Sequence, residues 1–424
     1  MIGLAALMLA VTLPSPAAGS WEGTMRRGTA TLPVRLRLDA GGARGWFSSP
    51  DLGAIDIPLS RVRATRAVHC ELAGDRTTTV FDAGIVGDAM SGTFREGALR
   101  RGTIRLHRIA GDAARPYALQ QVTFVNGNVR LGGTVYVPRT PGEHPAAVLV
   151  HGSGPEGRWA TAYIADALAR RGIVALAYDK RGVGASSGDW RTSTLDDLAL
   201  DARAAVHLLA ERTDVDRARV GVYGHSQGAE IAPQIARDNP EVRWLSAADG
   251  PIGPLYRQDL FRVDTMLAKR YSGDALARAE ALYAEMVDVA RTGAQHDKLR
   301  ADIAAAGRAP WLDDLAIPAD DSWIWAWYAK VGDYDNTDAW AHVTVPVLVL
   351  FGENDAVVPE RESVAETLRV LHAHGNDRVS VRIFPGADHT LRIPPADADG
   401  WPRNAPGFPA VLAAFAIRPG DAAP

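Results

Sequence analysis

The chain has 424 residues, of which 47% are hydrophobic and 23% charged, and its formal net charge is −4. This composition is ordinary for a soluble globular protein, the charge argues against a nucleic-acid partner, and the length predicts more than one domain. Cys70 is the single cysteine, so an intramolecular disulfide is excluded. The sequence contains no Cys/His cluster, and we therefore expect neither a metal nor another cofactor.

The N-terminus predicts a signal peptide over residues 1–19. An apolar run from Ile2 to Leu13 is followed by small residues, with a cleavage site expected near Ala18 or Gly19. The run is too short to span a bilayer. The cleavage region contains no cysteine, so a lipid anchor is not supported. We therefore expect a periplasmic or secreted protein without a stable membrane anchor.

Residues 20–110 show the alternation of apolar and polar side chains that half-buried antiparallel strands require. Leu32, Val34 and Leu36, for example, interleave with arginines. We predict a small all-β domain, either a sandwich or a lipocalin-like barrel, followed by a linker over residues 111–119. The domain is rich in arginine, which indicates either a solvated basic face or contact with an anionic membrane or glycan surface.

Residues 120–418 show a different pattern, in which strands and helices alternate. A hairpin with a type I′ turn at Asn126-Gly127 opens the region. A helix over 160–170, a strand over 173–178 and a helix over 195–211 are expected next. This alternation predicts an α/β domain with a mostly parallel sheet.

The most informative motif is the G-x-S-x-G sequence over residues 224–228, directly after the apolar run 220–223. A sharp turn from a strand into a helix leaves little room beside its apical residue, and Gly224 and Gly228 supply that room. The following helix places its positive N-terminal end beside the hydroxyl of Ser226. Ser226 is thus the candidate nucleophile; the alternative, a helix N-cap, leaves the two glycines unexplained.

Two later strands end in loops that carry a candidate acid and a candidate base. The strand over 345–351 leads to Asp355, and the strand over 379–384 leads to His389. The chain order of nucleophile, acid and histidine is that of one convergent form of the catalytic triad. Asp355 competes with Asp249, which follows another apolar stretch, and with Asp388. The remaining candidate histidines, which do not follow the last strand, are His151, His225, His372 and His374, and His225 is expected to pack beneath the turn.

These motifs together resemble the α/β-hydrolase superfamily, and more narrowly bacterial esterases of the dienelactone-hydrolase and serine-aminopeptidase branches. The matching segments are residues 151–155, 178–182, 224–228 and 386–389. The resemblance implies an oxyanion hole made by the backbone N–H groups of Gln227 and Ser153, with Gly154 as the alternative to Ser153. In the segment 178–182, we expect Asp179 and Arg181 to brace the loop by ion pairing rather than to bind substrate.

An insertion of about residues 252–340 has helical periodicity and predicts a cap over the active site. Its aromatic residues either line an acyl pocket or form the core of the cap; they are Trp311, Trp323, Trp325, Trp327 and Tyr328.

The substrate class stays open at the level of sequence. A small-molecule ester of a short or medium acyl group is the leading hypothesis, while a thioesterase, lactonase or aminopeptidase-like peptidase would use the same residues, and a silent binding module is the non-enzymatic alternative. A peptidase would need a cap acid to hold the substrate ammonium, and the candidates are Glu280, Glu285, Asp313, Asp314, Asp320 and Asp321. The sequence gives no oligomeric state.

Overall fold

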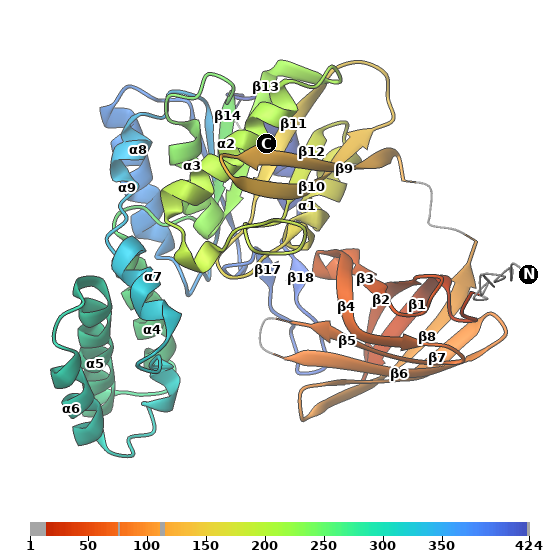
Figure 1. Cartoon of the computed structure of the whole chain (residues 1–424), viewed down its shortest axis with the longest axis horizontal. Helices are drawn as coiled ribbons and strands as arrows, with labels where there is room; N and C mark the ends of the chain where they lie inside the picture. The colour runs from red at the N-terminus through yellow and green to blue at the C-terminus, as the bar shows by residue number, and fades with distance from the viewer. Residues whose placement is uncertain (1–13, 75–76, 111–114, 422–424) are drawn as a thin grey trace, which may run out of the picture. The chain divides into compact units, whose positions relative to one another are not determined.

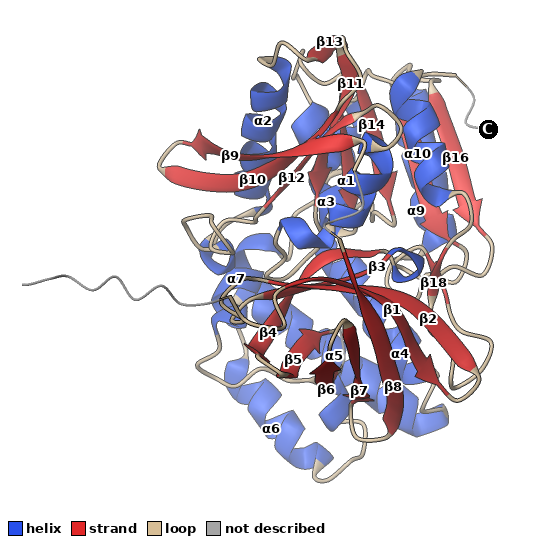
Figure 2. Ribbon diagram, turned by 90° about the vertical axis from the view of Figure 1, so that its right-hand side faces the viewer, coloured by secondary structure: helices blue, strands red, loops and turns tan. Residues whose placement is uncertain are grey.

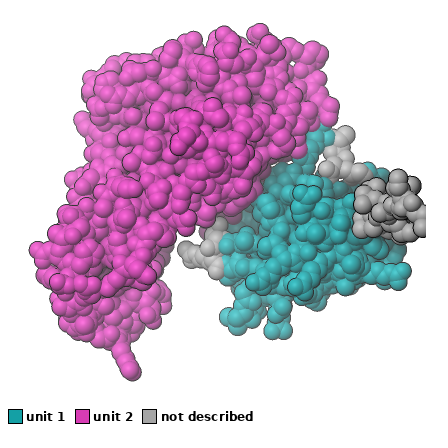
Figure 3. Space-filling model, in the orientation of Figure 1, with its two compact units in different colours: residues 1–115, 395–403 teal, residues 116–394, 404–424 magenta. Residues whose placement is uncertain are grey.

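The computed structural model describes residues 14–74, 77–110 and 115–421. The predicted signal peptide therefore lies mostly outside the described residues. Two compact units divide the chain, and Figure 3 colours them separately. The first comprises residues 1–115 and 395–403, and the second comprises residues 116–394 and 404–424.

The first unit is a closed antiparallel barrel, so of the two predicted β architectures the barrel is the one that forms. Strands β1 and β8 pair with each other and close it. The strands are β1 (Gly19–Arg27), β2 (Ala30–Leu38), β3 (Gly45–Ser49), β4 (Ala54–Ala64), β5 (Ala67–Ala73), β6 (Thr78–Val86), β7 (Ala89–Glu96) and β8 (Arg100–Ile109).

The barrel interior is filled with apolar side chains, as the alternation in the sequence predicts. In β2 every second residue from Leu32 to Leu38 is buried. Phe81 lies between Phe47 and Phe94, with ring centroids 6.1 and 6.3 Å apart. Cys70 is buried in the same core, and burial raises the pKa of its thiol to about 12.

The segment 395–403 belongs to the barrel unit although it comes from the far end of the chain, which the sequence did not reveal. Trp401 packs on Phe94, with centroids 6.2 Å apart, and the buried Arg27 lies over its ring. The Arg27 guanidinium also donates to the carbonyl of Asp399 at 2.9 Å. This segment begins six residues after His389 in the sequence.

The second unit is built on a sheet with strand order β16-β15-β14-β13-β11-β12-β10-β9. Strands β12, β11, β13, β14, β15 and β16 run parallel, while β10 pairs antiparallel with both β12 and β9 (Figure 2). The bounds are β9 (Tyr117–Asn126), β10 (Val129–Pro138), β11 (His144–Val150), β12 (Val174–Tyr178), β13 (Val215–His225), β14 (Trp244–Ala248), β15 (Val347–Gly352) and β16 (Val379–Phe384). A short pair, β17 (Arg392–Ile393) and β18 (Arg403–Asn404), follows.

The opening hairpin forms, but its turn differs from the predicted one. Asn126 pairs with Val129, so the two turn residues are Gly127 and Asn128 rather than Asn126 and Gly127. Gly127 has a φ of 57°, and Asn128 is not among the residues with positive φ. This pattern fits a type II′ turn, with glycine at the first central position, and not type I′. The strand β9 also begins at Tyr117, inside the predicted linker.

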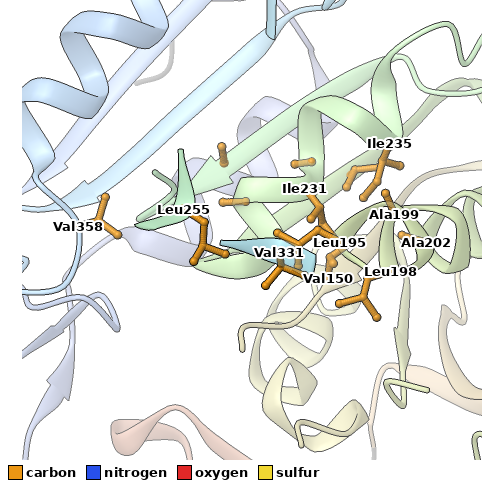
Figure 4. Packing of buried hydrophobic residues seen from close by; sticks show 14 of the residues in the cluster. Val150, Leu195, Leu198, Ala199, Ala202, Ile231, Ile235, Leu255, Val331 and Val358 are labelled. Carbon is orange, nitrogen blue, oxygen red and sulfur yellow. The ribbon is translucent and has the colours of Figure 1, made fainter. Parts of the chain in front are cut away.

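Helices cover both faces of the sheet, which is why its central strands are apolar without alternation. One face packs against α1 (Ala162–Ala169) and α10 (Phe408–Ile417). The other packs against α2 (Leu195–Ala210), α3 (Gln227–Ala236) and α9 (Glu360–Ala373). Figure 4 shows how Ala199 and Ala202 of α2 lie against Ile231 and Ile235 of α3.

The predicted cap forms as a group of helices inserted between β14 and β15 (Figure 1). The helices are α4 (Leu255–Ala268), α5 (Gly273–Thr292), α6 (His296–Ala306), α7 (Trp323–Val331) and the short α8 (Thr337–Ala341). Within the described part of the chain, none of the helices combines the length and apolarity needed to cross a membrane.

Candidate active site

Ser226 stands at the sharp turn between β13 and α3 in a strained backbone conformation. Its φ of 53° and ψ of −120° are costly for a residue with a side chain, typically by about 1–3 kcal/mol. A Cβ added to Gly224 would lie 2.2 Å from the carbonyl oxygen of Gly228, and one added to Gly228 would lie 2.3 Å from that of Val150. Both glycines are therefore required by the close approach of backbone that holds this turn.

Three of the predicted residues are brought together from separate loops. The Ser226 hydroxyl lies 2.9 Å from Nε2 of His389, and Nδ1 of His389 lies 2.8 Å from Oδ2 of Asp355. The Asp355 side chain is fully buried, and its Oδ1 accepts the backbone N–H groups of Val357 and Val358. In this arrangement His389 donates from Nδ1 to Asp355 and accepts from Ser226 at Nε2.

Asp249, the alternative acid, lies close to this group but does not make the hydrogen bond to His389. Its Oδ1 accepts the N–H of Gly352 at 2.8 Å. Burial, together with the nearby charge of Asp355, raises the pKa of Asp249 well above its ordinary value. Asp388, the other alternative, accepts the N–H groups of Thr390 and Arg392 within its own loop.

Asp249, Asp355 and His389 also form a group whose potential metal ligands lie within 4.8 Å of one another. Both ring nitrogens of His389 are already engaged, one with Asp355 and one with Ser226. A cation would have to displace one of these contacts. The donor set therefore suits proton transfer better than metal coordination.

His225 contacts the loop that carries His389. Its Nε2 donates to the backbone carbonyl of His389 at 2.8 Å. Burial, and then the proximity of His389, lowers the pKa of His225 to about 4, so the ring is neutral. This hydrogen bond joins the serine turn to the histidine loop.

The other three histidines have different neighbours. His151 is buried beside Tyr178, and burial followed by the charge of Lys180 lowers its pKa to about 3. Nδ1 of His374 lies 2.8 Å from the carbonyl oxygen of Val370, and His372 lies near Asp377.

Lys180 is the residue that the sequence reasoning missed at this site. Its buried ammonium donates to the carbonyls of Gly152 and Gly154 at 2.6 and 2.8 Å and to Oε1 of Gln227 at 3.0 Å. Burial lowers its pKa to about 8, although the charge of Glu156 acts in the opposite direction. Lys180 thus joins the two backbone segments expected to form the oxyanion hole.

The neighbours of Lys180 in the sequence brace the same region, each with its own partner. Asp179 pairs with Arg158 at 2.7 Å, and Arg181 pairs with Asp201 at 2.7 Å. Both contacts are structural ion pairs, as expected, but Asp179 and Arg181 do not pair with each other.

A cavity of about 540 Å³ opens beside Ser226, between the turn and the cap helices. Ser153 and Gln227 line it, as do the cap aromatics Trp323, Trp325, Trp327 and Tyr328. Trp311 is buried in the core instead. None of the six cap acids considered in the sequence is among the described lining residues; the carboxyl groups that line the cavity are Glu230 and Asp259.

The fold and the serine-centred turn agree with the family comparison. The model of the alpha/beta hydrolase family matches residues 147–400. The chain belongs to the alpha/beta hydrolase family, and its hydrolase unit is preceded by an eight-stranded barrel.

Two proteins are similar to part of this sequence. Esterase EstD of Thermotoga maritima is 28% identical over 280 residues, covering 63% of this chain and 58% of EstD. The uncharacterized protein Rv2307c of Mycobacterium tuberculosis is 38% identical over 125 residues, covering 30% of this chain and 43% of that protein. The alignments thus span about half the length of these relatives.

Among solved structures, the esterase Pf2001 of Pyrococcus furiosus aligns with 67% of this chain and 88% of its own, at 21% identity and a TM-score of 0.47. The hypothetical protein PA2218 of Pseudomonas aeruginosa aligns with 72% of this chain and 94% of its own, at 19% identity and a TM-score of 0.47.

Proposed function

We propose that the protein is a serine hydrolase, a carboxylesterase that cleaves esters of short or medium acyl groups through an acyl-enzyme on Ser226. The observation that carries this proposal is the continuous hydrogen-bonded series from Ser226 to His389 to Asp355, whose serine end faces a cavity. Such a series activates a hydroxyl that is otherwise a weak nucleophile.

The first half of the reaction follows from the directions of these hydrogen bonds. Nε2 of His389 takes the proton of the Ser226 hydroxyl as Oγ attacks the ester carbonyl, and the C=O π bond opens to an oxyanion. Asp355 holds the tautomer with Nδ1 protonated and stabilises the imidazolium that forms. As the C–O bond to the alcohol breaks, His389 returns the proton to the leaving oxygen.

Water completes the cycle by the same steps. His389 removes a proton from water as the water oxygen attacks the acyl carbon, and the bond to Ser226 then breaks with return of the proton to its Oγ. In both halves the oxyanion lies between the N–H of Gln227, at the positive end of α3, and the N–H of Ser153. Lys180 holds these two donors in place through its three hydrogen bonds.

The preference for an ester over other acyl compounds is supported by EstD, to which the chain is similar and which is named an esterase. The cavity volume of about 540 Å³ falls within the ordinary range of small-molecule sites and supports a small-molecule substrate. A thioester, lactone or peptide would react by the same steps, and these remain the alternative substrates.

Hydrolysis of a p-nitrophenyl ester series, from acetate to palmitate, tests the proposal. Wild type is expected to release nitrophenolate with an optimum at short or medium chains, and Ser226→Ala is expected to lose this activity. The matched control is Ser272→Ala, because Ser272 is exposed and makes no capping hydrogen bond. Ester hydrolysis that persists in Ser226→Ala contradicts the proposed nucleophile. If the wild type is inactive on all esters but hydrolyses thioesters, lactones or peptides, the proposed substrate class is wrong and the active class takes its place.

The silent-module alternative predicts a different result in a second assay. A folded wild-type protein that hydrolyses none of these acyl compounds and takes up no fluorophosphonate would support it. We propose further that the chain is exported to the periplasm or secreted, supported by the apolar N-terminal run. N-terminal sequencing of protein recovered outside the cytoplasm is expected to begin near Ala18 or Gly19, and an intact Met1 contradicts this.

A further inference from the structure

Glu230 is a buried acid in the cavity that the proposed chemistry does not use. It lies one helical turn after Ser226 on α3, and its N–H bonds to the Ser226 carbonyl at 2.9 Å. The residue is 4% exposed and lines the same cavity as Ser226. Its carboxylate oxygen Oε1 is buried without a hydrogen-bond partner. A buried polar atom of this kind is unusual, because desolvation is costly unless a partner replaces water.

The other acid in the cavity has its partners. Asp259 pairs with Arg262 at 2.6 Å and accepts the hydroxyls of Tyr283 and Tyr328 at 2.8 and 3.2 Å. These contacts neutralise its charge and occupy its oxygens. Glu230 is therefore the lining acid that has no cation of its own among the described residues.

The groups around Glu230 in the protein do not supply the missing donor. The Asn336 amide donates to the backbone carbonyl of Glu230 and not to its carboxylate. The hydroxyl of Tyr334, whose pKa is raised by burial and by the charge of Glu230, is also buried and makes no hydrogen bond to this carboxylate. Burial alone raises the pKa of Glu230 to about 8. The carboxyl is therefore mostly protonated near pH 7, and a cation bound beside it would favour its ionised form. A positively charged ligand group would pair with the carboxylate and lower its pKa towards the ordinary value of a glutamate.

Aromatic residues that line the same cavity suit the same ligand chemistry. Trp323, Trp325, Trp327 and Tyr328 from α7 line it, and the faces of such rings attract cations. An unpaired carboxyl combined with aromatic walls is the combination that binds an ammonium group while sheltering it from water.

The position of Glu230 also fits a group close to the reacting carbonyl. Ser226 and Glu230 line the same cavity, and the hydrogen bond from the Glu230 N–H to the Ser226 carbonyl holds the two residues one turn apart at the start of α3. A substrate amine separated from the scissile carbonyl by a few bonds can thus reach the carboxyl while the carbonyl lies against Ser226.

We propose that Glu230 binds an ammonium group of the substrate, so that the enzyme prefers esters carrying an amine a few bonds from the scissile carbonyl. This inference rests on the proposed esterase function. None of the cap acids suggested by the sequence is needed for it, because Glu230 comes from the helix that follows the nucleophile.

Two pairs of isosteric esters test the proposal and identify the side of the ester that carries the amine. Ethyl γ-aminobutanoate is compared with ethyl pentanoate, and acetylcholine is compared with its uncharged carbon isostere, by titrating released acid near neutral pH. In wild type at least one charged ester is expected to have the higher kcat/KM. Glu230→Gln is expected to lower that charged-to-neutral ratio at least tenfold while hydrolysis of the neutral ester persists.

The matched control is Glu362→Gln, which removes an exposed negative charge on α9 and is expected to leave the ratio unchanged. Equal ratios in wild type and Glu230→Gln, or a preference of wild type for both neutral esters, overturn the proposal.

A binding measurement separates this inference from the esterase proposal. In the Ser226→Ala background, ethyl γ-aminobutanoate is expected to quench tryptophan fluorescence, and the additional Glu230→Gln change is expected to weaken this binding at least tenfold. If Glu230→Gln weakens binding but the wild type hydrolyses no ester, the ammonium site is supported and the esterase function is rejected. Ester hydrolysis with binding indifferent to Glu230→Gln removes the ammonium site alone.

Discussion

Replacing Asp355 by asparagine tests which acid serves His389. The substitution keeps the size of the side chain but removes the negative charge 2.8 Å from Nδ1 of His389. At an effective dielectric constant of about 20, unit charges at this separation attract by about 6 kcal/mol. Because this attraction exists only when the imidazolium has formed, its loss raises the barrier, and we expect kcat to fall about ten-thousand-fold.

Asp249→Asn is the matched comparison, since Asp249 is a buried aspartate beside the same histidine. Burial and the charge of Asp355 raise the pKa of Asp249, which favours its uncharged form, so the neutral amide is a close replacement for this carboxyl. The asparagine oxygen can still accept the N–H of Gly352. We therefore expect less than about a tenfold loss of kcat, from small changes in packing.

Steady-state hydrolysis of a p-nitrophenyl ester near neutral pH measures both variants, with thermal unfolding to confirm that each is folded. An equal loss of kcat in folded Asp249→Asn and in Asp355→Asn would refute the reasoning. Asp249 would then contribute as much as Asp355 to stabilising the His389 imidazolium. Full activity of Asp355→Asn would refute the triad itself.

Three further predictions concern residues around the turn. Lys180→Met removes the donor that joins the Gly152–Gly154 loop to Gln227, and we expect a fall in kcat of about tenfold to a hundredfold with a smaller change in KM, measured by ester hydrolysis. Gly228→Ala places a Cβ 2.3 Å from the carbonyl oxygen of Val150, and we expect a loss of about 1–3 kcal/mol in unfolding free energy with nearly complete loss of activity; an active, equally stable variant contradicts the packing argument. Glu230 keeps a proton in the folded state between about pH 4.5 and about 8 that the unfolded chain releases, so stability falls as pH rises through this window, by at most about 1.4 kcal/mol per pH unit. Glu230→Gln lacks this fall and is expected to gain stability over wild type at about pH 8 but not at about pH 4, in urea unfolding.

The sequence predicted those parts of the site that depend on a strand, its end and the next loop. Ser226 and Asp355 follow buried strands and His389 follows the partly exposed edge strand β16, and the parallel sheet brings the ends of these strands to one edge. The barrel was predicted only as one of two β architectures, because alternation shows which face is buried but not whether β1 and β8 pair.

Other features depend on contacts between distant residues, which no local pattern contains. Lys180 resembles any lysine of a surface loop until its three acceptors, two of them carbonyls of the loop after β11, are in place. Glu230 falls in an apolar helix, and its lack of a partner is visible only once the cavity exists. The return of residues 395–403 to the barrel depends likewise on Arg27 and Phe94, more than 300 residues earlier.

The hairpin turn failed for a local reason. Asn126-Gly127 is a strong signal for a type I′ turn, but the pairing of Asn126 with Val129 moves the turn by one residue. Turn chemistry alone did not set the register, because Gly127 can occupy either central position with a positive φ.

The central claim is that Ser226 is the nucleophile, and covalent labelling tests it most directly. Purified protein would be treated with a fluorophosphonate, digested, and examined by mass spectrometry, with ester hydrolysis followed in parallel. We expect one phosphonylated peptide, modified at Ser226, with activity lost in proportion to labelling and no labelling in Ser226→Ala. Modification at another residue, or full ester hydrolysis by protein already labelled at Ser226, would contradict the account.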